Sequence, residues 1–219
     1  MSPAGIGKPC WRYSNRWVEH GPHPSKGDTL DLGAILGSGW ASGLNLYGVV
    51  ALLGIAGRND WIDSPAGLQQ WWVIAVAVFL FAIEFVADKV PVVDSIWDSV
   101  HIIVRPAGAA MLAIILAGDQ PTAQKVFTAV ASGSLALTSH GAKATTRLAA
   151  NTSPEPFSNI GLSVIEDLIV AAMIWLVAKS PTLAGIAAVV LAVLCVLLVW
   201  RLWRFAKRLF RRAPRAATA

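Results

Sequence analysis

The sequence has few cysteines and little charge, and each shortage excludes a class of protein. Cysteine occurs only twice in 219 residues, as Cys10 in a polar leader and as Cys195 deep in an apolar run. The two are poorly placed to meet, so we expect neither a disulfide bond nor a thiolate metal site. Charged residues make up 14% of the chain and hydrophobic residues 55%, which excludes an ordinary soluble domain.

A cleavable secretory signal is also missing from the start of the chain. Residues 1–28 are polar, rich in proline and glycine, and lack the apolar core of a signal peptide. We therefore expect the first apolar helix to act as its own insertion signal.

Long apolar stretches are what the sequence has in abundance. A helix of about 20 residues crosses a hydrocarbon core of about 30 Å. Stretches of that length predict an all-α polytopic membrane bundle of about six helices, at 31–56, 68–88, 97–118, 124–148, 160–179 and 182–203. The expected domains are a polar cytoplasmic leader, a transmembrane helical domain and a basic cytoplasmic tail, at 1–30, 31–203 and 204–219.

The basic residues predict how this bundle is oriented. Six crossings place both termini on one side, and 15 of the 18 Lys and Arg residues then fall on that side. The positive-inside rule makes that side the cytoplasm, so the chain is expected in the cytoplasmic (inner) membrane. The net charge of +5 thus reflects orientation and does not indicate a nucleic-acid partner. Basic residues spaced 3 or 4 apart after Trp200 predict a helical face that lies on anionic lipids.

The order of helix types suggests an internal repeat. A helix rich in small residues, a helix with an acidic pair and a plainly apolar helix follow one another twice. Three helices per unit would make the two units inverted, as in many secondary transporters.

Charged residues recur near the inner ends of four expected helices. Glu84 and Asp88 lie one turn apart where the 68–88 helix should still be in or near lipid. The next segment places acidic and basic groups on one helical face at spacings of 4, 3 and 4, namely Asp94, Asp98, His101 and Arg105. The fourth and fifth helices add His140, Lys143, Arg147, Glu166 and Asp167. Charge at such depth is costly unless it is offset, so we expect these groups to share one polar layer.

That layer supplies the candidate site. The residues expected to bind an ion or substrate are Glu84, Asp88, Asp98, His101, His140, Glu166 and Asp167, and their expected charge partners are Lys89, Arg105, Lys143 and Arg147. With Asp94 there are six carboxylates against four permanent cations, and the formal sum of 4 − 6 = −2 favours a bound cation. Carboxylate and imidazole ligands suit Mn²⁺ or Zn²⁺, so a divalent metal is one option and no other cofactor is expected.

Four motifs resemble a known family. They are E-x3-D-K-x-P at 84–91, S-H-x2-K-x3-R at 139–147, N-x-S-P-E-P-x-S-N at 151–159 and S-x2-E-D at 163–167. They are similar to an uncharacterised bacterial multi-pass membrane family, the domain of unknown function four-one-two-six, over residues 32–204. The resemblance implies a membrane module and no particular mechanism. A fainter likeness is to cation/proton exchangers with paired E-x-G-D-K motifs, from which Glu84 and Asp88 depart by one residue of spacing and a missing glycine.

Three functions remain open at this point. The first is a small transporter or exchanger that passes an ion or cationic solute by way of Glu84 and Glu166. The second is a membrane-embedded enzyme for lipid head groups, in which Arg105, Lys143 and Arg147 would bind phosphate. No hydrolase, phosphatase or transferase signature supports it, so a non-enzyme is favoured. The third is a scaffold whose charges only fix the register of the helices. The sequence does not decide whether the chain forms a homo-oligomer.

Overall fold

The computed structural model describes residues 31–150 and 156–212 and contains only helices over that part of the chain. The helices are α1 (Leu32–Ser42), α2 (Leu46–Arg58), α3 (Trp71–Ala87), α4 (Pro91–Leu116), α5 (Thr122–Ala150), α6 (Pro156–Lys179) and α7 (Pro181–Arg212). The predicted all-α fold is therefore confirmed. The expected leader at 1–30 lies outside the described residues, and α7 passes residue 204 without a break.

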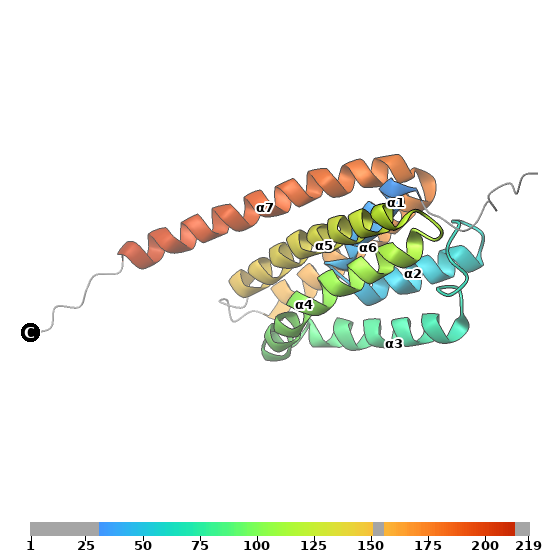
Figure 1. Cartoon of the computed structure of the whole chain (residues 1–219). Helices are drawn as coiled ribbons and strands as arrows, with labels where there is room; N and C mark the ends of the chain where they lie inside the picture. Colours follow the sequence, from blue (N-terminus) through green and yellow to red (C-terminus); the bar gives the residue numbers. More distant parts are fainter. Residues whose placement is uncertain (1–30, 151–155, 213–219) are drawn as a thin grey trace, which may run out of the picture.

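The five long helices α3 to α7 run back and forth along a bundle (Figure 1). α4 packs on α5, α3 packs on α2, and α1 packs against α5 and α7. We call the end that holds the connections 59–70 and 117–121 the loop end. The opposite end, which holds residues 88–90 and the C-terminal part of α7, is called the basic end. α7 extends beyond the other helices there (Figure 1).

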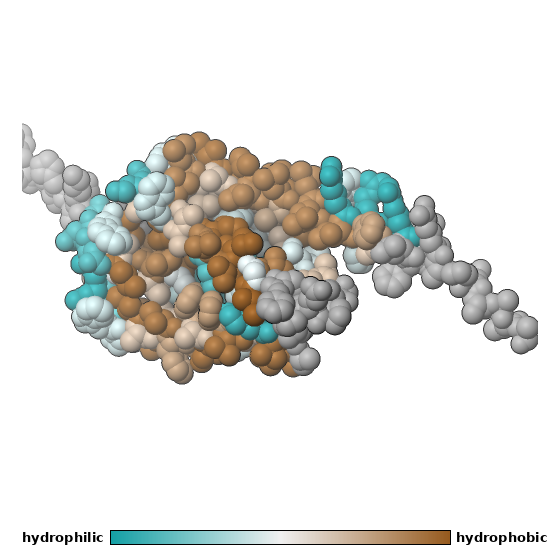
Figure 2. Space-filling view, turned by 180° about the vertical axis from the view of Figure 1, so that it is seen from behind, coloured by the Kyte–Doolittle hydropathy of each residue, from teal (hydrophilic) through white to brown (hydrophobic). Residues whose placement is uncertain are grey.

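Within residues 31–150 and 156–212, three helices are long and apolar enough to cross a membrane, which is fewer than the six expected. They are Val93–Leu116 in α4, Asn159–Lys179 in α6 and Pro181–Arg208 in α7. α3 is apolar but has only 17 residues, and α5 has 29 residues of which many are polar. On the face shown in Figure 2, the side of the bundle is nevertheless mostly apolar, and hydrophilic residues gather mainly toward the two ends. Together these features indicate a membrane protein.

The first expected crossing, 31–56, is broken into two short helices. The helical conformation is lost around Leu44, and Asn45 begins α2 in an extended conformation with φ −153°. The side-chain Oδ1 of Asn45 accepts a hydrogen bond from the backbone N–H of Gly48 at 2.8 Å, which is a standard N-cap. α1 and α2 have 11 and 13 residues, so each is about half as long as a membrane crossing.

α1 and α2 form a hairpin that enters the bundle from the loop end and returns to it. Gly33, near the start of α1, lies against the backbone of Pro181, where α7 begins at the loop end. Gly43, just after α1, lies against the backbone of Ala136, which is in the middle of α5. α1 therefore runs inward from the loop end and stops at mid-depth.

α2 runs back the way α1 came. Its start packs at mid-depth, where Leu46 lies against Gly108 of α4, and its last turn places Gly57 against Ser64 in the loop-end connection. The expectation of one continuous helix over 31–56 is therefore wrong. The start of α1 lies at the loop end, where Gly33 contacts Pro181, whereas α7 ends at the basic end (Figure 1).

Small residues allow α1 to occupy the centre of the bundle. Most of α1 is buried, and a Cβ added at Gly39 would overlap Ser132 of α5. Helices in a membrane associate through close backbone approach, which glycine and serine permit. The two halves of the expected inverted repeat do not match here, since the small-residue element is a hairpin in the first half and one unbroken helix, α5, in the second.

Candidate functional site

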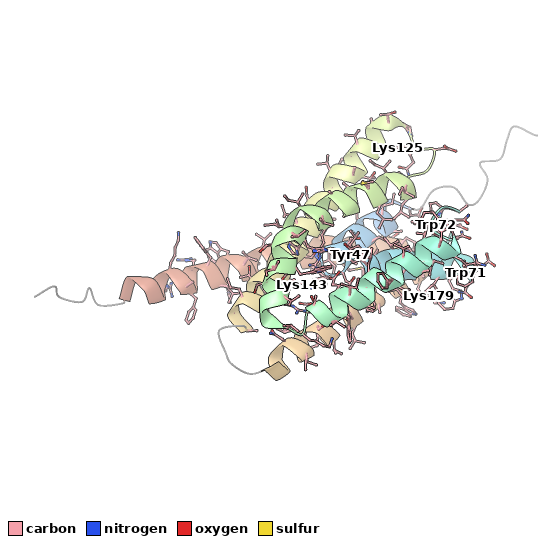
Figure 3. The ribbon with its side chains drawn as sticks, turned by 90° about the horizontal axis from the view of Figure 1, so that it is seen from below. Tyr47, Trp71, Trp72, Lys125, Lys143 and Lys179 are labelled. Atoms are coloured by element: carbon pink, nitrogen blue, oxygen red, sulfur yellow. The ribbon has the colours of Figure 1, made fainter. Side chains whose placement is uncertain are left out.

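Five carboxylates and three cations are buried together where the α1–α2 hairpin turns. They come from α4, α5 and α6 and from the C-terminal end of α3, and comprise Glu84, Asp88, Asp94, Asp98, Glu166, Arg105, Lys143 and Arg147. None of these residues is more than 8% exposed. Figure 3 shows Lys143 among the helices, whereas Lys125, Lys179 and the two tryptophans Trp71 and Trp72 lie at the loop end. We call the eight residues the charge cluster.

Arg105 connects α4 to three other elements. Its Nη2 donates to Glu84 Oε1 at 2.6 Å, and both side chains are fully buried. Its Nη1 donates to the carbonyl oxygen of Gly43 at 3.1 Å and to His140 Nδ1 at 2.7 Å. The same Nη1 lies 3.7 Å from Asp98 Oδ1, which is an ion pair without a hydrogen bond.

Lys143 lies between three carboxylates. Its Nζ is 3.0 Å from Asp88 Oδ2, 3.3 Å from Glu166 Oε2 and 3.4 Å from Glu84 Oε1. It also donates to the carbonyl oxygen of Leu44 at 3.2 Å. Gly43 and Leu44 follow directly after α1, so their carbonyls belong to the negative end of the α1 dipole and stabilise the nearby cations.

Arg147 holds the part of the charge cluster nearest the basic end. Its Nη1 donates to Asp94 Oδ1 at 2.9 Å and to the carbonyl oxygen of Asp88 at 2.7 Å. Its Nη2 donates to Asp88 Oδ2 at 2.9 Å and to Glu166 Oε2 at 2.6 Å. Arg105, Lys143 and Arg147 are thus each bound to carboxylates. The spacings of 3 and 4 from His140 to Arg147 do place these residues on one face of α5, as the sequence predicted.

The two predicted histidines lie beside the charge cluster with both ring nitrogens engaged. A guanidinium can only donate, so His140 accepts from Arg105 at Nδ1 and carries its proton on Nε2, which donates to the Asp98 carbonyl oxygen at 3.2 Å. His101 donates from Nδ1 to the Trp97 carbonyl oxygen at 2.8 Å and accepts at Nε2 from the Tyr47 hydroxyl at 3.2 Å. Neither ring has a free lone pair for a metal.

The divalent-metal option fits this arrangement poorly. Among the described residues, no group of three or more His, Cys, Asp or Glu side chains is arranged to hold a metal ion. The carboxylates are instead distributed around the three cations.

Besides the two histidines, the predicted site residues Asp167 and Lys89 also lie outside the charge cluster. Asp167 is half-buried and accepts a hydrogen bond from Asn45 Nδ2 at 3.1 Å. The Lys89 side chain forms no ion pair with the charge cluster. Its Nζ donates to the Phe85 carbonyl oxygen at 2.8 Å and lies 2.9 Å from the centroid of the Phe85 ring. Partial desolvation lowers the pKa of this ammonium.

Sequence reasoning missed the contribution of the hairpin to the site. Asn45 caps α2 and binds Asp167, the Gly43 and Leu44 carbonyls bind cations, and Tyr47 binds His101. One signal was present, because an Asn in the middle of an apolar run is a typical N-cap and marks the start of a helix.

The charge cluster carries an excess of negative charge. Five carboxylates and three cations give a formal sum of 3 − 5 = −2. Three of the buried carboxylate oxygens, Glu84 Oε2, Asp88 Oδ1 and Asp98 Oδ1, accept no hydrogen bond from the described residues. Buried carboxylates without compensation are costly, so these oxygens are the natural acceptors for a proton or a cation.

The fold and the charge cluster together define an all-helical membrane protein with a buried ion-pair site. The chain belongs to the family described as domain of unknown function DUF4126, which matches residues 32–201. This confirms the family predicted from the four motifs, although part of the third motif lies outside the described residues. No curated protein and no solved structure matches the chain at a significant level. The fainter likeness to cation/proton exchangers is not shown by these comparisons.

Proposed function

We propose that this protein is a small carrier of protons and monovalent cations. The observation that supports the proposal is the −2 excess of buried charge around the tip of a helical hairpin. Ionisable residues inside a membrane bundle commonly mark ion or proton pathways. Broken helices whose carbonyls face the site are a recurrent feature of secondary transporters.

Lys143 has the central part in the proposed mechanism. It is a flexible point charge shared by Glu84, Asp88 and Glu166, with all three distances between 3.0 and 3.4 Å. An incoming cation competes with the Lys143 ammonium for these carboxylates, and a proton bound to Glu84 or Glu166 releases it. Arg105 and Arg147 keep the carboxylates in place while this exchange occurs, because each guanidinium holds at least two partners.

The proposed membrane placement has five crossings, by α3 to α7, and a hairpin of α1 and α2 that enters from the loop end and leaves on the same side. Outside the charge cluster, the basic end carries Lys89 and the seven Lys or Arg residues between 201 and 215, which makes 1 + 7 = 8. The loop end carries Arg58, Lys125 and Lys179, and the leader that joins α1 there adds Lys8, Arg12, Arg16 and Lys26, which makes 3 + 4 = 7. The two totals are nearly equal, so the proposed orientation rests on the dense run of cations along the end of α7, which suits the anionic lipids of the cytoplasmic leaflet of a bacterial inner membrane.

Flux in proteoliposomes tests the carrier proposal. The purified chain is reconstituted with a pH-sensitive dye inside the vesicles, and gradients of Na⁺ or K⁺ are imposed from outside. We expect cation-dependent pH changes with the wild type and their loss with Glu84→Gln and with Glu166→Gln, since each substitution keeps the shape and removes the charge. Asp60→Asn is the matched control, because Asp60 is exposed in the loop-end connection. Wild-type flux in both glutamate variants would exclude the carrier proposal.

A scaffold is the second candidate, favoured by one specific observation. Arg147 alone makes four hydrogen bonds to three acidic residues, as expected of a structural network. A scaffold predicts no flux in the wild type either, whereas a carrier predicts flux that is lost in the variants. The head-group enzyme is less well supported, because the three cations that would bind phosphate are all occupied by carboxylates.

A further inference from the structure

A cavity of about 390 Å³ opens between α4 and α5 beside the charge cluster. Its polar wall is made by Asp94, Asp98, His140 and Arg147, all of them buried. The volume is in the range of ordinary small-molecule sites. The carrier proposal assigns no role to this cavity, and a ligand can occupy it whether or not the protein transports ions.

The cavity faces the side of the bundle. Its rim includes Ile102, Leu137 and Leu148, whose exposed fractions are 54%, 48% and 67%. Exposed apolar side chains on the flank of a membrane bundle face lipid tails. A ligand in this cavity therefore has an apolar body against the rim and a polar group against the wall.

Asp98 is a carboxylate of the cavity whose Oδ1 forms an ion pair with Arg105 but no hydrogen bond with the described residues. The residue is 8% exposed. Arg105 is 3.7 Å away and directs its donors at Glu84, Gly43 and His140. His140 donates to the carbonyl oxygen of Asp98 and not to its carboxylate. A buried carboxylate oxygen of this kind is stabilised by a donor with positive charge.

The wall favours an ammonium group over an anion. Both Arg147 Nη atoms are committed to Asp88, Asp94 and Glu166, which leaves only the buried Nε of this guanidinium without a hydrogen-bond partner among the described residues. An ammonium has three N–H donors and no acceptor. Ser99 also lines the cavity, and its hydroxyl donates to the Ser95 carbonyl oxygen at 2.8 Å, which leaves its lone pairs to accept an N–H.

We infer that the cavity between α4 and α5 binds the ammonium group of an amphiphile that enters sideways from the membrane. Asp98 accepts the ammonium, Ser99 accepts a second N–H, and the alkyl part lies along Ile102 and Leu137. An aminophospholipid and a free alkylamine share this chemistry, and the two sources are separated by experiment.

The test measures ligand binding to the full chain in detergent, by native mass spectrometry and by thermal shift. The probes are phosphatidylethanolamine, phosphatidylglycerol with the same acyl chains, dodecylamine and ethanolamine. We expect phosphatidylethanolamine or dodecylamine to bind about tenfold more tightly than phosphatidylglycerol, because only the former two present the charge-assisted donor. A preference for phosphatidylethanolamine assigns the site to the lipid, and an equal response to ethanolamine alone assigns it to a soluble amine.

Asp98→Asn should remove this preference, and Asp60→Asn at the loop end should not. Because Asp98→Asn can also alter folding, Ser99→Leu is a second variant. Ser99 is exposed and bonded only within its own helix, so the leucine obstructs the cavity and keeps every charge. Equal binding of phosphatidylethanolamine and phosphatidylglycerol, or a preference that survives in both Asp98→Asn and Ser99→Leu, would overturn the inference. Neither outcome depends on ion flux.

Discussion

The hairpin of α1 and α2 predicts which residues face the same side of the membrane. A helix rises 1.5 Å per residue, so the 11 residues of α1 extend about 16 Å and the 13 residues of α2 about 20 Å. Neither length reaches across a hydrocarbon core of about 30 Å. Asp31 and Asn59, at the outer ends of the two helices, should therefore lie on one side and Lys207 on the other.

Cysteine accessibility measures this directly. Single cysteines replace Asp31, Asn59 or Lys207 in a chain in which Cys10 and Cys195 are serine, and all three positions are exposed. Intact spheroplasts are treated with a membrane-impermeant maleimide before and after permeabilisation. We expect cysteines at positions 31 and 59 to react under the same condition, and a cysteine at 207 under the opposite one.

A fourth site controls for local protection. Thr122 is exposed at the loop end, so Thr122→Cys should react together with the position 59 variant. The reasoning would be refuted if position 31 reacted with position 207 while position 59 reacted from the other side. That result would restore a single crossing through 31–56.

Three further predictions concern stability in detergent, measured by thermal or denaturant unfolding. Arg105→Met leaves the fully buried Glu84 carboxylate with Lys143 as its only cation and should lower the free energy of unfolding by about 3–5 kcal/mol. The double variant Arg105→Met/Glu84→Gln should lose less stability than the sum of the two single variants. Strict additivity of the two losses would contradict the expected coupling. Gly43→Ala drives a Cβ into the Ala136 carbonyl and should cost about 1–3 kcal/mol, while Gly141→Ala meets open space and should be neutral or stabilising. Asn45→Ala removes the cap of α2 and should cost about 1 kcal/mol, and an unchanged midpoint would argue against the break at this residue.

The sequence was informative wherever the physics is local. Burial in lipid depends on the summed hydropathy of a stretch, so the apolar runs could be found without knowing how they pack. Helical spacing is also local. It correctly placed Asp94, Asp98 and Arg105 on one face of α4, and Lys143 and Arg147 on one face of α5.

The pairing within the site was not predictable in the same way. Lys89 has the same charge as Lys143 and follows directly after Asp88, yet it bonds to its own helix while Lys143 reaches three carboxylates. Which cation meets which acid depends on the relative height and rotation of α3, α5 and α6. Those are properties of packing between helices and leave no periodic signal in any one of them.

What the sequence alone determined is the class of the protein, an apolar helical bundle with a layer of charge, because hydropathy and helical period act within each segment. What the tertiary structure decided is the reversal of the chain at Leu44. A crossing helix and a hairpin bury the same apolar residues, so composition does not distinguish them. The choice is made by close contacts between distant segments, Gly33 on Pro181 and Gly43 on Ala136, which turn α1 inward and bring its carbonyls to the buried cations.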